Sequence, residues 1–184
     1  MFATHDLHTF TFPTLDADRA VTQSCLGWRQ GGCDIVWSDH LPRVLAAHGS
    51  AMCGGKTVLE LGAGCGLVGL IAAQFASRVD ITDGDPEEVD LIQMNVEAHA
   101  PAGGAVVSAQ FLEWGSAPAA EARSSGALLA GGYDVILAAQ VPSHASHQTR
   151  ALLSPAEASL RVASRRWCMS RRTLPSSSRR WRGC

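Results

Sequence analysis

Glycines at alternate positions follow a short apolar segment of this chain, and one acidic residue stands just before them. The apolar segment 58–61 contains Glu60. The small residues that follow are Gly62, Ala63, Gly64 and Gly66. A second apolar segment, 67–76, comes next, so the order predicts a buried strand, a tight turn and a helix. A turn without Cβ atoms lets a ligand approach the backbone closely, which is how adenosine-containing cofactors are bound.

Two cofactor motifs overlap in this turn. The glycines at 64, 66 and 69 match the dinucleotide fingerprint, and Asp83 follows at about the expected distance. Glu60 followed by alternating glycines is instead typical of S-adenosylmethionine (SAM) methyltransferases. A carboxylate at this strand end suits the ammonium group of SAM and would repel a pyrophosphate. Charge therefore favours SAM, and the alternative is that Glu60 is merely solvated at a strand terminus.

A second acidic site follows the next apolar segment. The segment 78–82 is predicted to be a strand that ends at Asp83. In doubly wound sheets, a carboxylate at the tip of the second strand accepts hydrogen bonds from ribose hydroxyls, so we assign Asp83 that role. Asp85 is expected to cap the next helix, with Pro86 at its first position. The alternative is that both aspartates only cap and turn the chain.

Several further segments occur in an order that is shared with one enzyme family. They are Val36-Trp37, Lys56 to Leu70, Ile81 to Gly84, Asn95-Val96, Glu113 to Gly115 and Tyr133 to Ala139. Over about residues 26–140 the chain resembles the seven-β-strand protein-lysine methyltransferases, which include calmodulin-lysine N-methyltransferase and methyltransferase-like enzymes that act on chaperones. The resemblance implies an α/β fold with a Rossmann-like, doubly wound and mainly parallel sheet, and SAM as the cofactor.

The resemblance also implies roles for individual residues. Trp37 would lie against the cofactor, Trp114 would flank its adenine, and Ala139 would line the cofactor pocket. The glycine turn would hold the cofactor near the carboxyl ends of the first and second strands. The alternative for both tryptophans is ordinary packing in or near the core.

The chain departs from the family at the end of the predicted fourth strand. The family has Asp-x-x-Tyr there, whereas this chain reads Gln140-Val-Pro-Ser143. Glutamine supplies no charge and serine supplies no ring, so we assign no catalytic residue. Methyl transfer needs mainly the alignment of a neutral amine, so loss of one acid need not abolish it. The resemblance implies a protein-lysine N-methyltransferase-like enzyme that methylates a side-chain nitrogen. The alternative is a catalytically inactive SAM-binding fragment or pseudoenzyme.

The composition changes at the same place. Residues 1–143 carry 6 Lys+Arg and 16 Asp+Glu, a formal net charge of −10, whereas residues 144–184 carry 9 Arg and one acid, a net charge of +8. We expect this Arg/Ser-rich tail to be disordered, a splice variant or the product of a frame error, in preference to an arm that binds nucleic acid. The sheet is then expected to be incomplete after its fourth strand, which would leave that strand with an unpaired edge.

These patterns divide the chain into three parts. An N-terminal extension with a lead-in helix covers 1–50, a SAM-binding Rossmann-like core covers 51–143, and the tail covers 144–184. In the extension we expect a short strand near 9–12 and a helix over 39–48. In the core we expect strands near 56–61, 78–82, 105–112 and 133–139, and helices near 66–76 and 86–99.

The remaining features point away from other classes of protein. We expect neither an export signal nor a membrane span, because no apolar segment is long enough or suitably flanked. The six cysteines lack the spacing of a zinc site or a disulfide framework. The His-x-x-His pairs at 5–8 and 144–147 lack a third ligand, so no metal is expected. We expect a monomer in the cytoplasm or nucleus that acts on a protein lysine, without a nucleic-acid or membrane partner.

Overall fold

Parallel strands joined by helices form the centre of the molecule, as the alternating apolar segments predict. The computed structural model describes residues 5–16, 18–28, 40–113, 128–129, 132–139 and 167–170. Within these ranges a five-stranded sheet has the order β5-β4-β3-β6-β7, and all neighbouring strands in it are parallel. The prediction of an α/β, Rossmann-like fold with a parallel sheet is confirmed.

The strands of this sheet are short. They are β3 (Thr57–Leu61), β4 (Arg78–Asp83), β5 (Val106–Phe111), β6 (Val135–Ala139) and β7 (Trp167–Ser170). Most residues of β3, β4 and β6 are buried on both faces of the sheet, which is the usual situation of central parallel strands. The bounds predicted for the first four strands differ from these by one or two residues.

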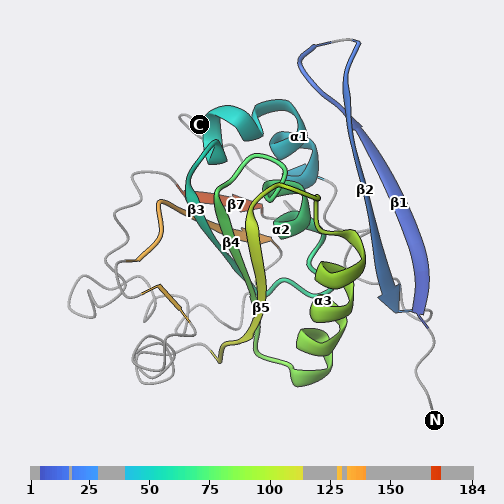
Figure 1. The fold of residues 1–184 in the computed structure, drawn as a ribbon, viewed down its shortest axis with the longest axis vertical. Coiled ribbons are helices and arrows are strands. Elements are labelled where there is room, and N and C mark those ends of the chain that lie inside the picture. Colours follow the sequence, from blue (N-terminus) through green and yellow to red (C-terminus); the bar gives the residue numbers. More distant parts are fainter. Residues whose placement is uncertain are drawn as a thin grey trace, which may run out of the picture.

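Three described helices pack on one face of the sheet (Figure 1). They are α1 (His40–Cys53), α2 (Leu67–Ala72) and α3 (Pro86–His99). The start of α3 is as predicted, because the Asp85 side chain accepts a hydrogen bond from the Glu87 N–H at 2.9 Å and Pro86 follows the cap. Helix α1 extends beyond the predicted end and stops before Gly55, whose φ of 65° suits a helix terminus. Helix α2 is shorter than predicted.

Apolar side chains form one cluster on each face of the sheet. On the helix side, Leu45 and Ile71 pack in the same cluster as Val58 of β3. On the other side, Leu59 belongs to a smaller cluster that includes Tyr133. Neighbouring residues of a strand point to opposite faces, so β3 contributes to both clusters and lies at the centre of the core.

The smaller cluster covers a buried polar network around Asp80. The Asp80 carboxylate is 0% exposed and accepts hydrogen bonds from Ser108 Oγ at 2.6 Å, from Arg78 Nε at 3.0 Å and from the Tyr133 hydroxyl. Burial raises the pKa of the Tyr133 phenol, and its hydrogen bond to Asp80 raises that pKa further. A buried charge needs such complete pairing, and this network ties β4 to β5 and to the segment before β6.

The N-terminal extension contains a hairpin, whereas one short strand was expected before the helix. Strand β1 (His5–Pro13) pairs antiparallel with β2 (Ala20–Trp28), and Figure 1 shows the hairpin on the outer side of the helices. Phe12, Val21 and Cys25 of the hairpin belong to the helix-side cluster. The sequence does not predict β2 because the polar residue Gln23 occupies an inward position and interrupts the apolar alternation.

One further strand pairs with the fourth strand, so that strand does not have the unpaired edge that we expected. Strand β7 comes from the Arg/Ser-rich tail and pairs with β6, with Trp167 opposite Ile136 and Ser170 opposite Ala139. Residues 167–170 of the tail are thus in a strand; the rest of 144–184 lies outside the described residues, and the expectation for it stays a prediction. A sheet edge offers backbone N–H and C=O groups, so a short Trp-Cys-Met-Ser segment can pair there although its surroundings in the sequence are polar.

Candidate cofactor site

The glycine turn lies at the carboxyl end of β3, where the order of the strands reverses. From β3 the chain proceeds through β4 to β5 on one side and then returns to β6 on the other side. In doubly wound sheets, the crevice at such a switch point is the usual ligand site. The register places Ala138 of β6 opposite Leu61, so Ala139 follows beside the first residue of the turn, Gly62.

The turn needs glycine for its backbone conformation. Gly62, Gly64 and Gly66 have φ values of 63°, 54° and 80°, in the region that residues with a Cβ atom rarely adopt. The turn is also held by backbone hydrogen bonds, from the Gly66 N–H to the Ala63 carbonyl at 3.0 Å and from the Ala63 N–H to the Thr82 carbonyl at 3.1 Å. The spacing of the glycines therefore has a conformational cause as well as leaving room for a ligand.

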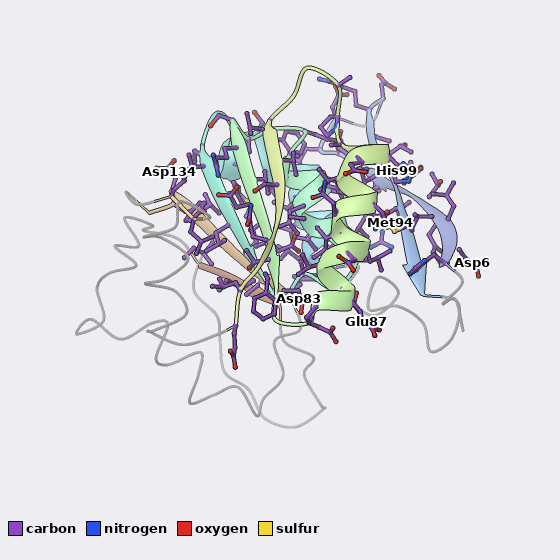
Figure 2. The ribbon with its side chains drawn as sticks, turned by 60° about the horizontal axis from the view of Figure 1, so that its bottom comes forward. Asp6, Asp83, Glu87, Met94, His99 and Asp134 are labelled. Carbon is purple, nitrogen blue, oxygen red and sulfur yellow. The ribbon has the colours of Figure 1, made fainter. Side chains whose placement is uncertain are left out.

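Asp83 connects the turn to the second strand. One of its carboxylate oxygens accepts a hydrogen bond from the Gly64 N–H at 2.9 Å, and the other accepts from the Asp85 N–H at 3.1 Å. Figure 2 shows Asp83 near Glu87 of α3, at the end of the sheet opposite to Asp134. The side chain is only half-buried, and a carboxylate has lone pairs left after two bonds. This geometry fits the hydroxyl groups of a ribose.

Glu60 lies beneath the turn. Its side chain is 1% exposed, and its Oε2 accepts a hydrogen bond from the Gly69 N–H at 2.8 Å. Burial raises the pKa of the Glu60 carboxyl from 4.5 to about 8; the Gly69 hydrogen bond lowers this pKa and the nearby charge of Asp83 raises it. The alternative of a solvated Glu60 is therefore wrong. Burial thus favours the neutral form of the acid, and a cation placed beside it would favour loss of the proton.

Gly69 allows α2 to approach β4 closely. A Cβ atom at this position would lie 2.5 Å from Glu60 Oε2 and 2.6 Å from Ile81 Cγ1.

We expect Gly69→Ala to lower the free energy of unfolding by about 1–3 kcal/mol, because overpacking outweighs the higher helix propensity of alanine. Thermal unfolding measures this loss. The control is Gly84→Ala, whose Cβ would be 3.6 Å from the Leu112 carbonyl oxygen and is expected to change stability by about 0.5 kcal/mol or less. Equal melting temperatures of Gly69→Ala and the unaltered chain would contradict this role.

Four residues that matter to the sequence predictions lie outside the described residues. They are Trp37, Trp114, Gln140 and Ser143. Their expected roles stay predictions.

Within the described ranges, no three His, Cys, Asp or Glu side chains are placed to hold a metal ion. In the same part of the chain, each helix is too short or too polar to cross a membrane.

Two buried polar residues at the turn have no role predicted from the sequence. Thr82 Oγ1 donates a hydrogen bond to the Glu60 carbonyl at 2.6 Å, and the Asn95 amide donates one to the Cys65 carbonyl at 2.9 Å. Both side chains are 0% exposed. The signal in the sequence is weak, since each is a single polar residue among apolar neighbours on a strand or helix.

Comparison with known proteins identifies the family of the chain. The profile of a lysine methyltransferase family matches residues 21–150. The calmodulin-lysine N-methyltransferase of Arabidopsis thaliana is 49% identical over 63 residues, which cover 33% of this chain and 21% of that protein. The protein N-lysine methyltransferase METTL21A of Danio rerio is 34% identical over 115 residues, which cover 61% of this chain and 49% of that protein. The matches thus cover about half, or less, of the length of each of these relatives.

A solved structure to which part of the chain is similar is that of the 16S rRNA N2 G1207 methyltransferase RsmC of T. thermophilus, in complex with AdoMet and guanosine. It has a TM-score of 0.43 and 18% sequence identity, and the match covers 74% of this chain and 33% of that one. The family profile covers more than half of the chain and includes β2, the glycine turn and Asp83. The resemblance predicted from the sequence is therefore confirmed, and the chain belongs to the lysine methyltransferase family.

Proposed function

We propose that this chain is the cofactor-binding part of a SAM-dependent methyltransferase that methylates a lysine side chain of a protein. The observation that carries the proposal is the hydrogen bond between the Gly64 N–H and Asp83, which joins the glycine turn to the acid of the second strand at the switch point of the sheet. Membership of the lysine methyltransferase family supports the reaction class.

Different described residues would contact different parts of SAM. The carboxylate of Asp83 would accept hydrogen bonds from the ribose hydroxyls. Glu60, beneath the turn, would ionise next to the ammonium of the methionine part, because a nearby positive charge favours the carboxylate. The glycines of the turn leave room for the cofactor to approach the backbone, and Ala139 lies beside them at the end of β6.

When bound, SAM supplies an activated methyl group on a positively charged sulfur. The task of the chain is then to hold that methyl group in line with a neutral amine and to keep water away, since alignment can account for much of the rate of such a reaction. Glu60 and Asp83 would fix the two ends of the cofactor from adjacent strands, β3 and β4. Two anchors on the rigid centre of the sheet define the orientation of the methyl group better than one would.

A protein substrate is supported by the names of the relatives, which are methyltransferases for lysines of calmodulin and of other proteins. A third such relative, the EEF1A lysine methyltransferase 3 of Mus musculus, is 42% identical over 88 residues, which cover 47% of this chain and 33% of that protein.

We further propose that the chain is monomeric and acts in the cytoplasm or nucleus. Analytical ultracentrifugation of the purified chain would measure its oligomeric state.

A catalytically inactive SAM-binding module is the second candidate. The observation that favours it is the sequence Gln140-Val-Pro-Ser143 in the place where the family has Asp-x-x-Tyr. Loss of the carboxylate and of the aromatic ring would affect the orientation of the incoming lysine and leave the site of the cofactor intact.

The experiment that tests the proposal is a transfer assay with SAM that carries a radiolabelled methyl group. Calmodulin and elongation factor 1A are suitable first substrates because relatives of this chain are named for them. We expect label on lysine, located by mass spectrometry of the labelled protein, and no label when lysines are first blocked by acetylation. Cofactor binding without transfer to any protein would support the inactive module, and absence of cofactor binding would contradict both candidates.

A further inference from the structure

Asn95 is a buried amide in the middle of α3 that contacts two other segments of the chain. Its side chain is 0% exposed. Its Oδ1 accepts a hydrogen bond from the Leu26 N–H, and its Nδ2 donates to the Leu26 carbonyl and to the Cys65 carbonyl, both at 2.9 Å. Three hydrogen bonds from one amide therefore join α3, strand β2 and the glycine turn.

The bonds to Leu26 are of the kind that the backbone of a neighbouring strand would make. Within the hairpin, β2 pairs with β1 on one edge only. On its other edge, the N–H and the C=O of Leu26 are both paired by the Asn95 amide, as they would be by the backbone of a further strand. This part of the interaction fixes the hairpin on α3.

The bond to Cys65 has a different consequence. Cys65 lies between Gly64 and Gly66 in the turn, and its carbonyl is held by the second N–H of the same amide. The two N–H groups of an amide diverge in a fixed plane, so docking of the hairpin orients the group that bonds the turn. The position of the turn and the position of the hairpin thus depend on one planar group.

A second buried amide provides a comparison. Gln23 of β2 is 4% exposed and donates to the Ser24 carbonyl at 2.9 Å and to the His99 carbonyl at 3.0 Å, while its Oε1 accepts from Gln74 Nε2 at 3.1 Å. The bond to His99 also fixes the hairpin on α3, at the end of the helix remote from the turn, and the bond from Gln74 fixes it on the segment after α2. Gln23 and Asn95 therefore share one function, and Asn95 adds the bond to Cys65.

We propose that Asn95 is a positioning residue of the cofactor site, which holds the glycine turn in its binding conformation and couples it to the docked hairpin. This inference rests on the proposed function of the turn in binding SAM. Coupling between two sites is reciprocal, so a ligand on the turn should also strengthen the docking of the hairpin.

The test compares Asn95→Ala with the matched variant Gln23→Ala. Each removes a buried amide that fixes β2 on α3, so both are expected to lower the melting temperature. S-adenosylhomocysteine (SAH) is then titrated calorimetrically, well below both melting temperatures. We expect the dissociation constant to rise about tenfold or more in Asn95→Ala, because the Cys65 carbonyl loses its buried partner, and to stay within about twofold in Gln23→Ala. If Asn95→Ala does not fold, it is replaced by Asn95→Leu, whose side chain has the same number and branching of non-hydrogen atoms.

Two results would overturn the proposal: SAH binding by a folded Asn95 variant within about twofold of the unaltered chain, or an equal loss of affinity in both variants. A purely structural role predicts the second result. If the unaltered chain binds no SAH, the proposed function fails, and amide hydrogen exchange without ligand decides on Asn95. Exchange in residues 62–66 that is about tenfold faster in Asn95→Ala than in Gln23→Ala supports the positioning role, and equal exchange overturns it.

Discussion

Replacing Glu60 by glutamine is expected to make the protein more stable at pH 8 and less able to bind its cofactor. The pKa of the buried acid is about 8, compared with 4.5 for an exposed glutamic acid. Between these values the unfolded chain has lost the proton that the folded chain keeps, so the free energy of unfolding falls as the pH rises. At about 1.4 kcal/mol per pKa unit, the total loss is on the order of 5 kcal/mol. Below pH 4.5 none of this free energy of unfolding is lost, and above pH 8 all of it is lost.

Glutamine at position 60 can still accept the hydrogen bond from the Gly69 N–H, and it does not titrate. We therefore expect the stability of Glu60→Gln to lack this decline with pH, so that the variant exceeds the unaltered chain by several kcal/mol at pH 8. Urea unfolding at pH 5 and at pH 8 measures the difference. The control Glu97→Gln changes an exposed acid on α3 and is expected to alter stability by about 0.5 kcal/mol or less. Parallel pH profiles of Glu60→Gln and the unaltered chain would show that Glu60 does not titrate as described.

The same substitution also tests the role of Glu60 toward the cofactor. If the ammonium of SAH docks beside Glu60, the acid must lose its proton, so binding at pH 7 should release up to about one proton per molecule bound. Calorimetric titration in two buffers with different heats of ionisation counts these protons. In Glu60→Gln we expect weaker binding and no such release. If Glu60→Gln and the unaltered chain bound SAH with equal affinity and equal proton release, the ammonium would have to dock elsewhere.

The second large effect is expected for Asp83. Its carboxylate would accept hydrogen bonds from both ribose hydroxyls, and a hydrogen bond to a charged group contributes about 1.5–3 kcal/mol. We expect Asp83→Ala to raise the dissociation constant of SAH about 100-fold, because it removes both acceptors and the bond to the Gly64 N–H. Asp83→Asn keeps one acceptor oxygen and is expected to lose about tenfold. Calorimetric titration with SAH measures both changes.

The neighbouring Asp85 provides the control for Asp83. Its side chain caps α3 through the Glu87 N–H, so Asp85→Ala is expected to cost about 1 kcal/mol of stability. Because that bond lies on the helix side of the strand end, the affinity for SAH should not change. Binding by Asp83→Ala within about threefold of the unaltered chain would exclude Asp83 as the ribose acid. An equal loss of affinity in Asp85→Ala would attribute the effect to the general stability of this loop.

Local features of the site could be predicted because their causes are local. The turn at Gly62 to Gly66 follows from backbone conformations that only glycine adopts easily, and the start of α3 follows from an aspartate and a proline at neighbouring positions. The four strands of the core follow from short apolar segments at regular intervals. The approach of Asp83 to the turn also follows from the sequence, since consecutive parallel strands end at the same edge of a sheet.

Features that depend on distant segments could not be predicted in this way. Strand β2 was missed because its inward Gln23 is paired with His99 of α3 and with Gln74, which follows α2, and no local pattern reveals these partners. Strand β7 was missed because pairing with β6 depends on backbone groups rather than on the composition of the tail.

The sequence by itself determined the family, the glycine turn and the two acids of the proposed cofactor site. Only the tertiary structure showed that Glu60 is buried, and burial of an acid at the end of a strand raises its pKa because it disfavours the charged form. Only the tertiary structure placed Asn95, through hydrogen bonds to a residue 69 positions away in the chain. Both depend on what packs against a side chain, and packing is a property of the whole fold.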